Sequence, residues 1–329
     1  MLRNLEKKLP STLYELYERR FNTCCRRRDS EHEELVKFLL YLVAHSFRPP
    51  LLDEVNTLLQ HDTKDPEFSV DEIPEAFTYF LRVGDPGSDA ETREQIQSMG
   101  GYSTAVQDLE KTSDNRNRIY DDGVLPIKFH ERSMRSFFHS GKGDSQLHWS
   151  PSDAHRRIFL KTAELAKFAP NASLKKLAGT FGKYATTYTL QHWREIDLEQ
   201  HSPAEQAEVM ETLWGILTDQ HGFARMVELN GFDGYEHGSR YADNFGKEGF
   251  EKIAKWAKLA QSDGDHPGLS EDAAQWWKDI ANDPKQALVV LAKAHLKRMY
   301  QAKSLGDSIS PYNGLLFALE TVSLFLTPI

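Results

Sequence analysis

The densest group of side chains that could bind or transform a small molecule lies between residues 221 and 245. This stretch combines glycine and aromatic residues with imidazole, guanidinium, carboxylate and phenol groups. Its polar members are His221, Arg225, Glu228, Tyr235, Glu236, His237 and Arg240. Loops of this length are usually functional or disordered, and polar groups that converge in an apolar pocket are typical of a ligand site. One hypothesis is therefore a small-molecule-binding protein, or an enzyme on a reused helical scaffold, with a pocket around residues 221–245.

Four histidines follow one another at spacings of 9, 9 and 7 residues, namely His130, His139, His148 and His155. An imidazole can serve as a general acid, a general base or a metal ligand. These spacings do not make the four side chains neighbours on one helix. We therefore expect each of them to be a surface or hydrogen-bonded histidine rather than a catalyst.

The sequence lacks the common signatures of nucleotide, metal and nucleophile chemistry. The P-loop pattern G-x-x-x-x-G-K-[ST] does not occur, so we expect no Walker-type ATPase within this chain. His32 and Glu33 begin like the zinc motif H-E-x-x-H, but Val36 stands where the second histidine belongs. No G-x-S-x-G elbow offers a serine nucleophile. We expect no metal and no cofactor, and the motifs favour a protein without catalytic activity while leaving an enzyme open.

Cysteine content, terminal sequence and charge indicate a cytoplasmic protein. The two cysteines, Cys24 and Cys25, are adjacent and cannot form the disulfide framework of a secreted domain. Charged residues occupy the N-terminus where a signal peptide needs an apolar core. The apolar stretch 314–329 contains Glu320 and is too short to span a bilayer. A formal net charge of −9 is a poor match for nucleic acid or an anionic membrane surface.

The hydrophobic spacing predicts a mainly α-helical protein of about two domains. Residues 31–47 have apolar side chains at helical spacing and stop at Pro49 and Pro50, which cannot continue a helix. A further helix is expected in residues 73–82, with Pro74 in its first turn. The helical spacing gives way to a partial alternation of apolar and polar residues only in residues 103–109 and 125–130. We expect these two segments to form one β-hairpin with a long tip.

Six segments carry a pattern that occurs in the same order in a known family. They are residues 9–19 (LPSTLYELYER), 33–59 (EELVKFLLYLVAHSFRPPLLDEVNTLL), 96–110 (IQSMGGYSTAVQDLE), 124–138 (VLPIKFHERSMRSFF), 154–168 (AHRRIFLKTAELAKF) and 181–193 (FGKYATTYTLQHW). In sequence and spacing they resemble the region that follows the nucleotide-binding core of fungal NACHT proteins, which are NLR-like members of the STAND class. The resemblance covers about residues 9–195, and beyond it the chain has only a general likeness to helical repeat arms.

The resemblance implies a winged-helix domain with one β-hairpin, followed by an α-helical superhelical arm. It also implies that His130 reaches a phosphate of a nucleotide bound to the NACHT core, which would lie N-terminal to this chain. Because the core is missing from the sequence, such a contact would form in trans, with a NACHT-containing relative as partner. The expected divisions are 1–30 (helical linker arm), 31–139 (winged-helix domain), 140–260 (helical domain) and 261–329 (antiparallel, repeat-like helices).

Two functions follow from these observations as alternatives. The first is a non-catalytic signalling module that relays conformational state, oligomerises or binds protein partners through the faces of stacked helices. The second is a small-molecule-binding protein, or an enzyme on a reused helical scaffold, with its pocket around residues 221–245. DNA binding by a winged helix is disfavoured, because the expected recognition segment 73–82 carries little basic charge and phosphate contacts dominate the affinity of such domains.

Overall fold

The computed structural model describes residues 12–25, 30–84, 125–140, 148–168, 181–218, 247–262, 268–284 and 286. Within these residues the chain is mainly helical and has one small antiparallel sheet, as the hydrophobic spacing predicts. The chain divides into two compact units. The first comprises residues 1–157 and 178–181, and the second comprises residues 158–177 and 182–329. In the described ranges, no helix is both long enough and apolar enough to cross a membrane.

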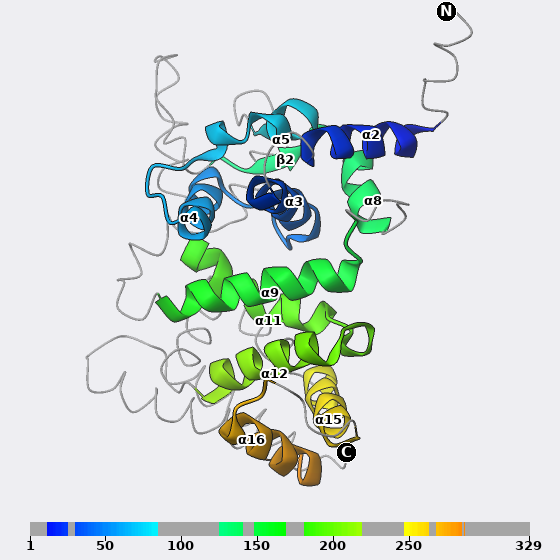
Figure 1. The fold of residues 1–329 in the computed structure, drawn as a ribbon, viewed down its shortest axis with the longest axis vertical. Helices are drawn as coiled ribbons and strands as arrows, with labels where there is room; N and C mark the ends of the chain where they lie inside the picture. Colours follow the sequence, from blue (N-terminus) through cyan, green and yellow to red (C-terminus); the bar gives the residue numbers. More distant parts are fainter. Residues whose placement is uncertain are drawn as a thin grey trace, which may run out of the picture. The chain divides into compact units, whose positions relative to one another are not determined.

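The first unit is built from short helices around one pair of strands (Figure 1). Its described elements are α2 (Leu13–Cys25), α3 (Ser30–His45), α4 (Leu52–Thr63), the 3-10 turn η1 (Val70–Glu72), α5 (Pro74–Tyr79), β1 (Leu81–Val83), β2 (Ile127–Phe129), α8 (Arg132–Ser140) and the start of α9 (Pro151–Phe168). Pro49 and Pro50 separate α3 from α4, and Pro74 occupies the first turn of α5. Lys64 ends α4 in the left-handed conformation, with φ of 55°.

The strand β2 is bonded on both of its sides. It pairs antiparallel with β1, with Leu81 opposite Phe129 and Val83 opposite Ile127. On the other side, the Ile127 N–H donates to the carbonyl of Pro50, and Leu51 forms a bridge to Pro126. The segment between α3 and α4 therefore lies at the position of a third strand, next to the ladder formed by β1 and β2.

Aromatic side chains from distant segments fill the core of the first unit. Phe138 of α8 lies at its centre, with ring centroids 5.4 Å from Phe21, 5.2 Å from Tyr41 and 5.5 Å from Phe80. All four side chains are essentially inaccessible to solvent, and such edge-to-face contacts add to the free energy of apolar burial. Through Phe21, α2 therefore contributes to the core of the first unit.

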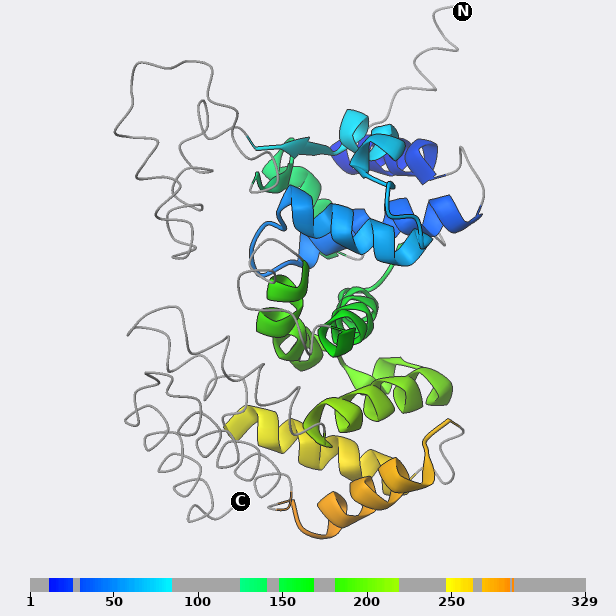
Figure 2. The ribbon, with the colours of Figure 1, turned by 90° about the vertical axis from the view of Figure 1, so that its left-hand side faces the viewer.

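The second unit is a stack of helices with one continuous core (Figure 2). Its described elements are the remainder of α9 from residue 158, α11 (Phe181–Glu195), the turn η3 (Leu198–Gln200), α12 (Pro203–Thr218), α15 (Lys247–Ser262) and α16 (Glu271–Asn282). α16 packs against both α12 and α15. Trp193, Trp256 and Trp277 are buried at the centre of this core, so their indoles anchor the packing of the helices.

Two details of the first unit differ from the sequence-based expectations. The strand that pairs with residues 127–129 is Leu81–Val83, which the apolar spacing assigns to a helix ending at residue 82 and to the loop that follows. The expected strand at 103–109 lies outside the described residues. The basic segment 24–29 (CCRRRD) is typical of an exposed turn in sequence, but Cys24 is a buried residue near the end of α2. The division into four segments stays a prediction.

Candidate functional site

His130 lies immediately after β2 and before α8, with its side chain exposed. Its backbone N–H donates to the carbonyl of Phe80 at 2.8 Å, which continues the ladder between β1 and β2 by one residue. Its ring nitrogen Nε2 lies 2.9 Å from the carbonyl oxygen of Phe77 in α5. The end of the hairpin and the preceding helix thus fix both the backbone and the ring of His130.

This hydrogen bond determines what His130 can offer to a ligand. A carbonyl oxygen can only accept, so Nε2 carries a proton and donates it to Phe77. Nδ1 is then an acceptor in the neutral ring and becomes a donor only in the imidazolium. A contact between Nδ1 and an anionic oxygen therefore requires the charged form of His130, and that contact would be a charge-assisted hydrogen bond.

The turn that follows His130 is attached to α2. The hydroxyl of Tyr17 donates to the carboxylate of Glu131 at 2.9 Å and lies 2.7 Å from the hydroxyl oxygen of Ser133. Burial raises the pKa of Tyr17, so its phenol remains a neutral donor. Tyr17 consequently links α2 to the turn next to His130.

Three histidines meet at the end of α3. His45 is buried, and its ring centroid lies 4.3 Å from that of His139 and 5.0 Å from that of His155. The cluster covers the carbonyls at the helix end: His139 Nε2 donates to Ala44 at 2.8 Å, and Arg135 donates to Ala44 and Ser46. Cationic and donor side chains at a helix C-terminus complement its partial negative charge.

Three imidazoles of the first unit are kept neutral. Burial first, and then the neighbouring His139, His155 and Arg135, lower the pKa of His45 to about 3. Burial also lowers the pKa values of His139 and of His148. Sequence spacing did not place these histidines together, and His45 was not among the candidates, because tertiary packing of α3, α8 and α9 creates the cluster.

The pocket that the sequence predicts around residues 221–245 lies outside the residues that the structure describes. Its polar members, His221, Arg225, Glu228, Tyr235, Glu236, His237 and Arg240, all lie outside the described residues.

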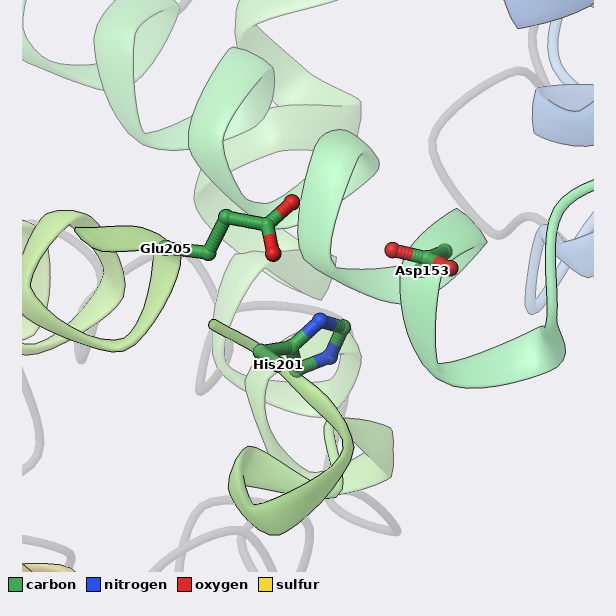
Figure 3. Close-up of side chains that lie close together, drawn as sticks. All are labelled: Asp153, His201 and Glu205. Atoms are coloured by element: carbon green, nitrogen blue, oxygen red, sulfur yellow. The ribbon is translucent and has the colours of Figure 1, made fainter. Parts of the chain in front are cut away.

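Glu205 and Asp153, two acidic residues labelled in Figure 3, each take part in capping the start of a helix, Glu205 in the second unit and Asp153 in the first. Figure 3 shows Glu205 in the first turn of α12 and His201 just before that helix. The Glu205 carboxylate accepts the Ser202 N–H at 3.1 Å and the Ser202 hydroxyl at 2.9 Å, which is half of a capping box. In the first unit, Asp153 accepts the hydroxyl of Ser150 at the start of α9. Both carboxylates are therefore explained by helix capping.

Comparison with known proteins gives no further assignment, because no family model, no curated protein and no solved structure matches this chain.

Proposed function

We propose that this chain is a non-catalytic regulatory module that binds protein partners. Its first unit would be a winged-helix domain and its second unit a helical arm, as in the NLR-type proteins that the sequence resembles. The observation that carries the proposal is the element order in the first unit. It runs α3, the bridge at Leu51, α4, α5, β1 and β2, with β2 bonded between β1 and the Leu51 segment.

That order is the one expected of a winged helix. Such a domain has three helices and a hairpin, and a short strand between its first two helices completes the sheet. The bonds from residues 50–52 to residues 125–127 match that short strand.

Charge favours a protein partner over nucleic acid. In a winged helix the third helix contacts DNA, and here that helix is α5 with the sequence PEAFTY, which contains Glu75 and no lysine or arginine. The turn η1 just before it adds Asp71 and Glu72. Phosphate contacts supply most of the affinity of DNA-binding domains, so an acidic surface at this position opposes such binding.

The position of His130 supports a contact with an anion on a partner. Its ring is exposed and held by Phe77, so that Nδ1 needs no reorganisation of the hairpin to act. The resemblance to NACHT proteins assigns a nucleotide phosphate to this histidine. The partner would therefore be a NACHT-containing relative that carries bound ADP.

The test is association in solution. Light scattering would give the mass of the full chain alone and after mixing with a separately expressed NACHT core loaded with ADP. We expect a stable heterocomplex that weakens with His130→Ala. The variant His130→Gln keeps an amide donor for the Phe77 carbonyl but cannot become cationic, so it should bind as weakly as His130→Ala.

Two outcomes would contradict the proposal. A monomer that ignores the core at every concentration would remove the partner mechanism and direct attention to a ligand at residues 221–245. A complex whose affinity is the same for the natural chain, for His130→Ala and for His130→Gln would show that the phosphate contact is not made. Thermal unfolding of both variants serves as the control for folding, because each retains the aromatic core around Phe138.

A further inference from the structure

The second unit contains a cleft of about 420 Å³ at the C-terminal end of α11. One wall is the end of α11 and the turn after it, residues 194–198. The other wall is α15, which presents Glu251, Lys252, Lys255 and Trp256. Both polar and apolar atoms line the cleft, so it can accept a small group with an apolar part.

Lys252 is held in this cleft in an unusual environment for an amine. Its Nζ lies 5.5 Å from the ring centroid of Trp256 and 5.9 Å from that of Trp193. Nζ also donates to the carbonyl of Arg194 in the last turn of α11. The two indoles are buried, and they displace water from one side of the amine.

Lys255, three residues along the same helix and in the same cleft, is a matched contrast. Its Nζ forms an ion pair with the carboxylate of Glu199 at 2.8 Å, and both side chains are exposed. That hydrogen bond raises the pKa of Lys255. Burial instead lowers the pKa of Lys252 to about 8, although Glu195 and Asp197 act in the opposite direction. One cleft therefore holds two lysines whose amines differ in hydration and in protonation.

We propose that Lys252 is an acylation site that takes acyl groups from activated donors such as acyl phosphates, with the cleft accommodating the acyl group. This inference does not depend on the proposed partner function. Its basis is the desolvated amine at the edge of an open cleft, which has room beside Nζ and both polar and apolar atoms in its lining.

The reaction needs no further co-reactant. The lone pair of the neutral Nζ attacks the acyl carbonyl carbon, and a C–N bond forms. The bond from that carbon to the phosphate oxygen breaks, and phosphate leaves with the electron pair. The nitrogen loses one proton to water, which leaves a neutral amide at Lys252.

Protonation sets the expected rate difference. Near neutral pH, an amine of pKa about 8 has on the order of a hundredfold more neutral form than an ordinary lysine. Nucleophilicity falls with basicity, and by analogy with thiols this reduces the advantage by about tenfold. Lys252 should then be acylated on the order of tenfold faster than Lys255.

Acylation would also change the second unit. The ammonium of Lys252 meets the carbonyl end of α11, where a cation is favourable. A neutral amide removes this charge and leaves Glu195 and Asp197 with one cation fewer. The end of α11 should therefore loosen when Lys252 is acylated, which makes the modification a means of regulating this helix.

The test uses the full chain with acetyl phosphate, and with trace acetic anhydride across a range of pH, followed by peptide mass spectrometry. We expect Lys252 to react about tenfold faster than Lys255 near neutral pH, with a labelling midpoint near its pKa of about 8. In denaturing urea the two lysines should react alike, because the difference arises from the fold.

Equal or slower labelling of Lys252 in the folded chain would overturn the proposal. So would a difference that persists in urea, because it would then come from local sequence. The regulatory part has its own readout. Hydrogen exchange at the end of α11 should increase in Lys252→Gln and stay unchanged in Lys252→Arg, which retains the charge; equal exchange in the two variants would refute it.

Discussion

The imidazole of His45 lies against two others: its centroid is 4.3 Å from that of His139 and 5.0 Å from that of His155. His45 is 3 % exposed. Burial, the two histidines and Arg135 all disfavour its charged form, and the nearby backbone of Phe138 opposes them only in part. A proton added to His45 would be poorly solvated and close to the cationic Arg135, so the folded first unit favours the neutral ring of His45.

Acid should therefore destabilise the first unit. The pKa of His45 is about 3 in the folded chain and ordinarily 6.5, so below about pH 6.5 the unfolded chain binds the proton that the folded one refuses. This stabilisation is complete above pH 6.5 and is lost as the pH falls towards 3. From His45 alone, the free energy of unfolding should decrease by about 2 kcal/mol between about pH 8 and pH 5. Hydrogen exchange of the α3 and α8 amides measures this decrease, once the exchange rates are corrected for their intrinsic dependence on pH.

The variant His45→Phe provides the control for this pH effect. At about pH 8 His45 is neutral, so the difference in the free energy of unfolding between this variant and the natural chain measures the change in packing alone. The variant's loss of stability on going to about pH 5 should be smaller by about 2 kcal/mol. An identical pH dependence in both proteins would show that His45 does not titrate as its surroundings indicate.

The sequence predicts the helical elements well because their determinants are local. The apolar spacing of residues 31–47 and the break at Pro49 and Pro50 produce α3 as expected. The position of β1 could not be found this way, since a three-residue strand has too little periodicity and is set by its partner Ile127–Phe129. The clustering of His45 with His139 was equally out of reach, because helix packing and not spacing brings them together.

Removal of Glu54 should destabilise the first unit strongly. Its carboxylate is buried, accepts the Leu51 N–H at 2.8 Å, and binds both terminal nitrogens of Arg48. Glu54→Ala leaves the partly buried guanidinium of Arg48 without its carboxylate, which should cost about 3–5 kcal/mol in the free energy of unfolding. Urea unfolding of Glu54→Ala, Arg48→Met and the double variant tests this. We expect the double variant to be less destabilised than Glu54→Ala; strict additivity would mean that the pair is not coupled.

The hydroxyl of Ser270 should contribute both to the start of α16 and to its contact with α12. It accepts the N–H of Ala273 and lies 2.9 Å from the Glu211 carboxylate, to which it donates. Ser270→Ala should lower the free energy of unfolding of the second unit by about 1 kcal/mol. Ser270→Asp keeps a capping oxygen but places it beside Glu211, so it should recover stability only when combined with Glu211→Gln. Equal stability of Ser270→Asp with either residue at 211 would contradict the contact.

Neighbouring tryptophans on α16 offer a matched pair for the core of the second unit. Trp277 is fully buried and its indole N–H donates to the carbonyl of Met210 at 3.3 Å, whereas Trp276 is partly buried at the edge of the same core. Trp277→Ala should cost about 3–5 kcal/mol because it leaves a cavity in the core. Trp276→Ala should cost clearly less, since water can fill the space it leaves. Urea unfolding followed by circular dichroism compares the two variants. Both substitutions are on the same helix and change its helix propensity by nearly the same amount. If the two losses were equal, the packing of α16 against α12 would differ from the one that buries Trp277.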